Sequence, residues 1–133
     1  MILADTSAWV EYDRATGSAV DQRLTSLVVA DIPTVAVTEP VIAEACMGAR
    51  SDARERDLRR FLGRFQLLPL DTTNDFDAAV RIYRACRRVG VTPRGLIDCL
   101  IAAVALRHDA ALLAADADIR RIAEVMPLRL DVY

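Results

Sequence analysis

Short aliphatic runs alternate along this chain with longer segments of helical periodicity, and this alternation restricts the possible folds more than any other feature. No repeat, low-complexity tract or linker interrupts it. This order of elements is typical of an α/β domain built on a parallel sheet. The chain has 133 residues, enough for one hydrophobic core but not for two. We therefore expect one continuous α/β domain over residues 1–133.

The apolar runs predict a parallel sheet of five strands flanked by about seven helices. The strands are expected at residues 1–4, 32–37, 66–70, 111–114 and 128–133, the last of them as an edge strand. The helices are expected at about 6–14, 18–29, from 38 onward, 52–65, 73–89, 96–108 and 118–125. Thr6 or Ser7 is expected to cap the first helix and Thr38 the third, while Gly17 and Gly90 end helices.

One of these helical segments is apolar almost without interruption. Residues 96–106 read LIDCLIAAVAL, so this helix must be buried, and Asp98 is its only interior charge. Burying a carboxylate is costly unless a partner neutralises it. The partner is expected to be an arginine, the amides of the helix N-terminus or a metal cation. A plain capping role for Asp98 in the first helical turn stays open as the alternative.

Three further acids are expected near the same edge of the sheet. Asp5 closes the first strand and Asp116 follows the fourth, while Glu44 lies in a helix that flanks such a strand end. Open parallel sheets bind ligands beyond the carboxyl ends of their strands, near the point where the strand order reverses. The sequence therefore predicts that Asp5, Glu44, Asp98 and Asp116 form one site.

A cluster of four carboxylates has a definite chemical requirement. The groups repel one another and raise one another's pKa values unless divalent cations bind between them. Hard oxygen ligands suit Mg²⁺ or Mn²⁺, ions that keep several waters and bridge to substrate phosphates. Such ions can activate water for attack on a phosphodiester without help from histidine or lysine. This matches a chain that has one histidine and no lysine.

The remaining composition excludes several classes of protein. Net charge is −2, so the whole molecule is no indiscriminate polyanion binder. Two arginine-rich stretches, residues 50–64 and 81–97, are candidate phosphate-facing surfaces, with a merely solvated helix face as the alternative. The three cysteines form no C-x-x-C pair, which argues against disulfides and zinc. With no basic leader and no apolar run of about 20 residues, we expect a soluble cytoplasmic protein that is not bound to a membrane.

Four motifs, taken in order, resemble those of PIN domains. They are Asp5-Thr6-Ser7 after the first strand, VTEPVIAEACMG with Glu44, RGLIDCLIAAVA with Asp98, and ALLAADADI with Asp116 and Asp118. Size and spacing are more closely similar to those of the VapC-type toxins of bacterial toxin–antitoxin pairs. The resemblance covers essentially the whole chain. It departs from the family pattern at Ile119, where an aromatic residue often follows the second acid.

This resemblance implies a Mg²⁺- or Mn²⁺-dependent endoribonuclease that cuts structured RNA, most often tRNA, and arrests translation. Hydrolysis would leave a 5′-phosphate and a 3′-hydroxyl. By motif position the catalytic metal ligands are Asp5, Glu44, Asp98 and Asp116, with Asp118 as an accessory metal ligand; Thr6 or Ser7 would support the ligands. The resemblance also implies a cognate antitoxin protein that masks the site, and a homodimer.

Other readings of the acids can be compared with this one. A phosphoreceiver domain needs a lysine, and this chain has none. A phosphoaspartate hydrolase needs D-x-D-x-T after the first strand, but Ser7 stands in place of the second acid. A DNA nuclease would use the same metal chemistry but usually adds arches and clamps. A catalytically silent PIN-like module that binds RNA or protein is the alternative from another class, and it predicts that substitution of Asp5 or Asp98 changes nothing.

Three residues keep open roles at this stage. Arg94, just before the Asp98 helix, could contact a scissile phosphate or serve as an ordinary charge partner of the acids. Trp9 and Tyr12 are three residues apart on the first helix. They could stack on a base or contact an antitoxin, although aromatic pairs at this spacing are more often part of the core.

Overall fold

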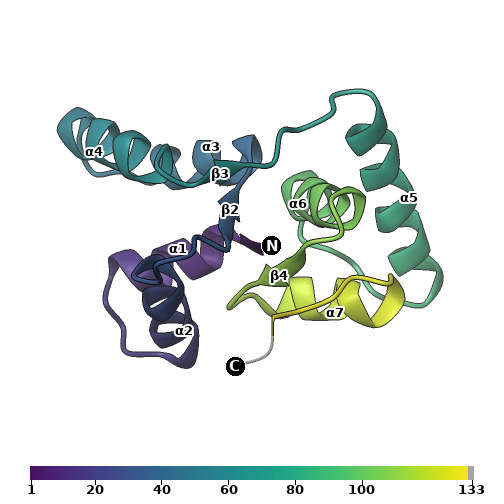
Figure 1. The fold of residues 1–133 in the computed structure, drawn as a ribbon. Helices are drawn as coiled ribbons and strands as arrows, with labels where there is room; N and C mark the ends of the chain where they lie inside the picture. Colours follow the sequence, from purple (N-terminus) through teal and green to yellow (C-terminus); the bar gives the residue numbers. More distant parts are fainter. Residues whose placement is uncertain (132–133) are drawn as a thin grey trace.

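The chain folds into a parallel sheet enclosed by helices (Figure 1). The computed structural model describes residues 1–131. The elements are β1 (Ile2–Ala4), α1 (Thr6–Asp13), α2 (Ala19–Val28), β2 (Val35–Val37), α3 (Glu39–Met47), α4 (Asp52–Leu62), β3 (Gln66–Leu67), α5 (Asn74–Arg88), α6 (Leu96–Arg107), β4 (Ala111–Leu113) and α7 (Ala117–Val125). The predicted α/β class, parallel sheet and seven helices are confirmed for the described residues.

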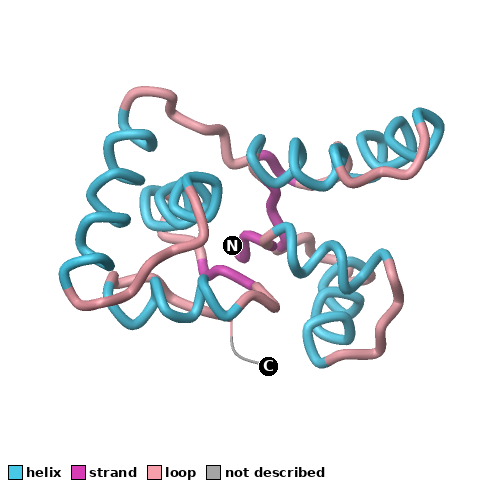
Figure 2. The backbone as a smooth tube through the Cα atoms, turned by 180° about the vertical axis from the view of Figure 1, so that it is seen from behind, coloured by secondary structure: helices cyan, strands magenta, loops and turns pink. Residues whose placement is uncertain are grey.

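The sheet has the strand order β3-β2-β1-β4, and every described pairing is parallel. Ile2 of β1 stands between Val35 of β2 and Ala111 of β4. The first strand is therefore an interior strand, and Figure 2 shows the N-terminus near the middle of the molecule. The chain extends the sheet from β1 through β2 to β3 and then returns to the other side of β1. The strand order thus reverses between β1 and β4, where ligands of such sheets bind.

The strands are nearly continuous apolar runs because helices cover both faces of the sheet. All of β2 is buried, as are Leu3, Leu112 and Leu113. In Figure 1, α5, α6 and α7 lie together on the side of β4, and α1 to α4 lie beyond β1 and β2. Residues 99–105 of α6 are all buried, as its unbroken apolar sequence predicts. The core therefore holds α6 rigidly, with its first turn at the sheet edge.

The fifth predicted strand is the main difference from expectation. In the described part of the chain, Leu130 pairs with Leu112 only as an isolated parallel bridge, and residues 132–133 lie outside the described residues. Asp131 forms an ion pair with Arg23 of α2 at 2.8 Å. The end of the described chain is thus fixed by one bridge and a side-chain contact rather than by a ladder. The prediction of a fifth strand over 128–133 was wrong for the described residues.

Two other strands are shorter than predicted because proline interrupts them. β2 begins at Val35, after Pro33, and Ile32 is 77% exposed. β3 ends at Leu67, and Pro69 follows two residues later. Proline has no amide hydrogen to give to a ladder, so it stands at strand ends.

The cap of the first helix also differs from the prediction. Asp5 itself is the N-cap of α1: its carboxylate accepts a hydrogen bond from the Ser7 amide at 3.0 Å. Thr6 and Ser7, expected as caps, lie in the first turn. The reason is that Asp5, directly after β1, still has an extended backbone (φ −68°, ψ 160°), so its own side chain can cap the helix that begins at Thr6.

Two further observations concern the rest of the chain. Cys46, Cys86 and Cys99 are free and buried. No helix among the described residues combines the length and apolarity that crossing a bilayer requires.

Candidate functional site

Asp5 stands at the junction of three elements. Its amide donates to the carbonyl of Leu113 at the end of β4 (2.8 Å), which fixes the ends of the two central strands against each other. Its carboxylate is 3% exposed. One oxygen, Oδ2, accepts hydrogen bonds from the Ser7 hydroxyl (2.6 Å) and amide. The other, Oδ1, is buried and has no partner in the described residues.

The Ser7 hydroxyl connects the two strand ends a second time. It donates to Asp5 and accepts a hydrogen bond from the amide of Ala115, just after β4, at 2.9 Å. Its donor and acceptor capacities are both used, so the orientation of the Asp5 carboxylate is set by the chain on both sides. Ser7 is therefore a positioning residue for Asp5.

Glu44 reaches this edge from α3. Thr6 at the start of α1 donates its hydroxyl proton to Glu44 Oε1 over 2.7 Å. The contact joins residues 38 positions apart in the chain. Thr6 and Ser7 thus each hold one acid of the site by a hydrogen bond.

Asp98, Asp116 and Asp118 form the most compact part of the site. One carboxylate oxygen from each lies within 4.8 Å of the others. Asp98 is in the first turn of α6 and Asp116 is the N-cap of α7, where its Oδ1 accepts from the Asp118 amide at 2.8 Å. The N-termini of two helices therefore meet at this edge, and helix dipoles favour negative charge there.

The carboxylates of the site repel one another. Burial, with the charges of Asp5, Asp116, Glu44 and Asp118, raises the pKa of Asp98 to about 7. Burial also raises the pKa of Asp5, against the opposing effect of the two Ser7 hydrogen bonds. The other four acids that the sequence singles out thus lie close enough to influence Asp98.

Two arginines lie at the rim of the cluster. Arg94 approaches Asp118 at 3.6 Å and Asp116 at 3.9 Å, with its side chain 76% exposed. Arg121 pairs with the other oxygen of Asp118 at 3.0 Å. The sequence had identified Arg94 but not Arg121, although its spacing of three residues from Asp118 on one helix is a usual ion-pair signal.

The donor set fits a divalent cation such as Mg²⁺ or Mn²⁺. Two ligand oxygens on one Mg²⁺ lie at most about 4.2 Å apart, given bonds of about 2.1 Å. The three aspartate oxygens need only a small adjustment to reach that separation. The unpartnered Oδ1 of Asp5 offers a further ligand, because a buried acceptor without a donor is stabilised by a cation. Asp5, Glu44, Asp98, Asp116 and Asp118 are the residues that could hold such an ion.

Trp9 and Tyr12 belong to an aromatic cluster and not to the acid cluster. Trp9 is 4% exposed and packs with Tyr12, Phe61 and Phe65 in an aromatic cluster. The core reading of Trp9 is therefore correct. His108 follows α6 at the end opposite Asp98, so it does not belong to the site.

Replacing Ser7 with alanine tests the positioning role. We expect Ser7→Ala to lower divalent-cation affinity by about 10-fold, since loss of a group that orients a ligand has effects of this size. Stability should fall by about 1–2 kcal/mol because the Ala115 amide loses its acceptor. Isothermal titration with Mn²⁺ and thermal melting measure both. Ser26→Ala, which removes an exposed hydroxyl on α2, is the matched control; equal Mn²⁺ affinity of the two variants would contradict the role.

Comparisons with known proteins agree with this geometry. The family model "PIN domain" matches residues 2–125. Ribonuclease VapC11 of Mycobacterium tuberculosis and a VapC ribonuclease of Mycobacterium bovis are each 44% identical to this chain over 129 residues, which is 97% of this chain and 96% of each relative.

Solved structures share the fold. VapBC2 from Rickettsia felis, bound to a promoter DNA fragment, superposes with a TM-score of 0.77 at 20% identity, covering 100% of this chain and 99% of that one. VapC20 of Mycobacterium tuberculosis, described as a Sarcin-Ricin loop cleaving toxin, superposes with a TM-score of 0.67 at 18% identity, covering 97% and 99%. These likenesses establish the fold, and the family match with the 44% identity establishes the family. The chain belongs to the PIN-domain family, among the VapC ribonucleases.

Proposed function

We propose that this protein is the toxin of a VapBC-type pair, a Mg²⁺- or Mn²⁺-dependent endoribonuclease that cuts structured RNA, above all tRNA, and so inhibits translation. The observation that carries the proposal is the convergence of five acids on the strand-order reversal, with the pKa of Asp98 raised to about 7 and Asp5 Oδ1 buried without a partner among the described residues. Such strongly perturbed carboxylates are typical of functional sites and destabilise a fold that has no use for them.

Each acid has a role in this proposal. Asp5, Glu44, Asp98 and Asp116 hold the metal, and Asp118 is an accessory ligand at the rim. The bound ion would supply an activated water and would neutralise charge developing on the phosphodiester. Ser7 and Thr6 keep the Asp5 and Glu44 carboxylates in orientation through the hydrogen bonds described above. The short helix–strand junctions at Asp5 and Asp116 make the site rigid, because β1 and β4 hold both residues from one side.

The surface next to the site suits a polyanionic substrate. The arginine-rich stretch 81–97 covers the exposed side of α5 and the connection to α6, with Arg81, Arg84, Arg87 and Arg88 all exposed. Such residues would contact the RNA backbone without reading bases. A Sarcin-Ricin loop cleaving toxin among the structural neighbours supports a structured RNA as the substrate class.

A protein partner and a second copy belong to the same proposal. The VapBC assemblies among the fold neighbours support a cognate antitoxin that binds this chain and masks the acids. We further propose a homodimer and a cytoplasmic location, as expected of a toxin that acts on cellular RNA.

The direct experiment is incubation of total bacterial RNA with the purified, antitoxin-free protein in Mg²⁺ or Mn²⁺, beside an EDTA sample. We expect discrete fragments with 5′-phosphates, lost in EDTA and in the Asp5→Asn variant. Sequencing of the fragment ends identifies the RNA that is cut. A folded protein that cleaves no RNA in either metal would favour a silent binding module instead.

In this proposal Arg94, which lies at the rim of the acids, contacts a phosphate of the RNA substrate. We expect Arg94→Gln to lower kcat/KM for RNA by about 10- to 100-fold, as loss of a charge-assisted phosphate contact would. The same variant should bind Mn²⁺ more tightly without RNA, because a positive charge near Asp116 and Asp118 is gone. Arg94→Lys should restore activity only in part, since an ammonium cannot reproduce the planar fork.

Opposite changes in these two measurements separate a phosphate anchor from a residue that merely keeps the acids in place. The latter role predicts weaker Mn²⁺ binding together with weaker cleavage. Arg120→Gln, an exposed arginine of α7 without an ion pair in the described residues, is the matched control.

A further inference from the structure

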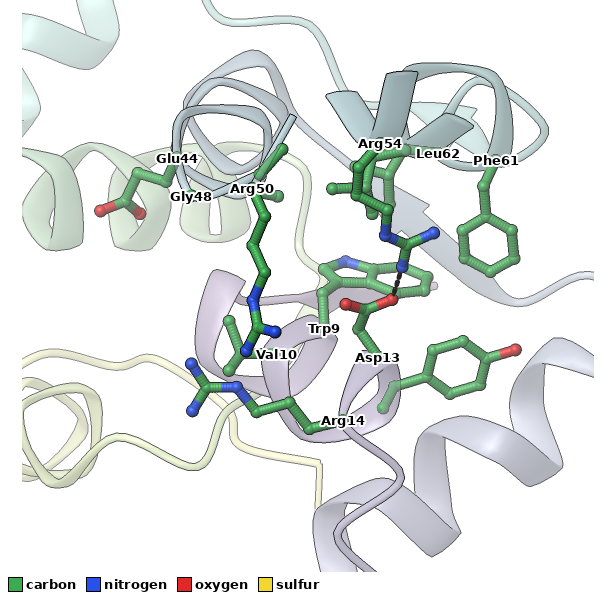
Figure 3. Close-up of a pocket in the computed structure, with 14 residues that line it drawn as sticks. Trp9, Val10, Asp13, Arg14, Glu44, Gly48, Arg50, Arg54, Phe61 and Leu62 are labelled. Atoms are coloured by element: carbon green, nitrogen blue, oxygen red, sulfur yellow. Dashed lines mark hydrogen bonds and ion pairs between the residues drawn. The ribbon is translucent and has the colours of Figure 1, made fainter. Parts of the chain in front are cut away.

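A groove leaves the acid site along α1 and is bounded by the C-terminal part of α3 and by α4 (Figure 3). Its volume is about 740 Å³, within the range of ligand-binding sites in proteins. Glu44 belongs both to the acid cluster and to the lining of the groove. On the side of α1 the groove is lined from Trp9 to Arg14, which corresponds to about 7 Å along the helix axis.

The charges of the groove are unevenly compensated. Arg54 on α4 forms an ion pair with Asp13 at the end of α1. Arg14 and Arg50 also line the groove, and neither forms an ion pair within the part of the chain described. Figure 3 shows their side chains extending toward one another from opposite walls, over Val10. Two cations that line one groove without acidic partners repel each other, and an anion that enters the groove reduces the repulsion and can accept hydrogen bonds from them.

The floor of the groove is apolar. Trp9 is buried beneath it, and the rings of Tyr12 and Phe61 stack at 5.7 Å with an interplanar angle of 11°. Tyr12, Phe61 and Leu58 are only partly buried. The groove therefore combines an apolar surface, against which a base can pack, with cations at its walls. Single-stranded nucleic acids are bound by this combination.

We propose that this groove binds the RNA strand beside the cleavage point, with a backbone phosphate between Arg14 and Arg50 and a base against the apolar floor. The proposal rests on the proposed nuclease function, since it places the scissile phosphate at the acids. RNA is the occupant that the observations favour, because the groove opens at Glu44 and a strand cut at the acids must leave the site over adjoining surface. A phosphate at every nucleotide also matches two unpaired arginines better than an apolar protein segment does.

The test measures RNA binding without cleavage. The Arg14→Gln/Arg50→Gln variant is compared with the unaltered protein in filter binding of end-labelled bulk bacterial tRNA, in EDTA and over a series of salt concentrations. We expect affinity to fall about 10-fold and the salt slope to decrease by roughly 0.7, the value for one lost phosphate contact on a single strand. Arg56→Gln/Arg60→Gln, on the exposed side of α4 outside the groove, has the same change in net charge and is expected to bind nearly as the unaltered protein does.

The outcomes separate this inference from the proposed function. If both double variants weaken binding equally, the effect is one of general charge and the groove assignment is wrong. If Arg14→Gln/Arg50→Gln binds tRNA normally but loses affinity for an antitoxin, the groove serves the protein partner and the inference is overturned. Cleavage of total RNA in Mg²⁺ is measured in parallel. If the unaltered protein cleaves RNA and Arg14→Gln/Arg50→Gln binds tRNA as tightly as it does, only the groove assignment is wrong. If the unaltered protein binds tRNA through the groove but cleaves no RNA, only the proposed nuclease function is wrong. Circular dichroism of all variants confirms that they are folded.

Discussion

Asp98→Asn should abolish RNA cleavage and at the same time make the metal-free protein more stable. We expect a loss of activity on the order of 100-fold or more, as for removal of one electrostatic group from an active site. Stability should rise by roughly 1–2 kcal/mol at pH 8, a value reduced to allow for the partial exposure of this carboxylate. The gain arises because the folded state no longer holds an ionised carboxylate among four other acids.

The pH dependence of stability follows from the sign of the pKa shift. The pKa of Asp98 is raised from 3.8 to about 7 in the folded metal-free protein. The folded state therefore holds the proton more tightly than the unfolded chain, so stability is greatest below the unfolded pKa and declines as pH rises to about 7. Asp98→Asn should flatten this decline. Asp5, whose pKa is also raised, adds a dependence of the same sign, and Asp71, whose pKa is lowered by the Asn74 hydrogen bonds, adds one of the opposite sign.

Thermal melting in EDTA between pH 4 and pH 8 measures both effects. Asp57→Asn, the same change at an exposed position of α4, is the control and should follow the unaltered protein. Added Mg²⁺ should stabilise the unaltered protein at pH 8 more than the Asp98→Asn variant, since the ion binds the ionised cluster. If Asp98→Asn melts at a lower temperature than the unaltered protein in EDTA at pH 8, then the Asp98 carboxylate stabilises the metal-free fold, and the expectation is wrong.

Asp75→Ala should have the largest effect on stability without touching the site. Asp75 is 1% exposed and accepts two hydrogen bonds from Arg107, each of 2.9 Å, and one from the Asp71 amide. These bonds join the start of α5 to the end of α6, and Arg107 also donates to the Pro69 carbonyl. Loss of one partner of a buried pair costs about 3 to 5 kcal/mol. We expect about 2 to 3 kcal/mol here, because Arg107 is 33% exposed and can be solvated.

The corresponding fall in melting temperature is roughly 10 °C for a chain of this size. Asp77→Ala, two residues later and exposed, is the control and should melt close to the unaltered protein. RNA cleavage by Asp75→Ala at 25 °C should be retained, since the acids lie at the other end of α6. Equal melting temperatures of the two variants would mean that the Asp75–Arg107 pair contributes little.

The identity of the acids could be predicted because their signals are local. Asp98 is a single charge in an apolar helix, and Asp5 and Asp116 each follow a short apolar strand. A buried helix and the end of a buried strand can each be recognised from the pattern of a few neighbouring residues. Trp9 carried no equivalent signal, because a helical aromatic residue can face either a groove or the core, and only the packing against Phe61 and Phe65 places it in the core.

Contacts between distant segments could not be predicted in the same way. The Thr6–Glu44 hydrogen bond, the Asp75–Arg107 pair and the two approaches of Arg94 to the acids each depend on how helices pack. The strand predicted at the C-terminal end also depended on contacts with a distant segment. Alternating residues over 128–133 suit a strand, but whether a ladder forms depends on the neighbour that is available, and here only Leu130 bridges to β4 among the described residues.

The sequence by itself determined that this chain is a parallel α/β domain with a set of acids at the ends of its strands, because hydrophobic period and isolated charge are properties of short segments. The tertiary structure alone decided the order β3-β2-β1-β4, which brings Asp5 and Asp116 beyond the ends of neighbouring strands. It also decided the groove between α1, α3 and α4, with two arginines that form no ion pair among the described residues. Both depend on packing between segments far apart in the chain, and that packing is settled by the burial of the whole core rather than by any one stretch of residues.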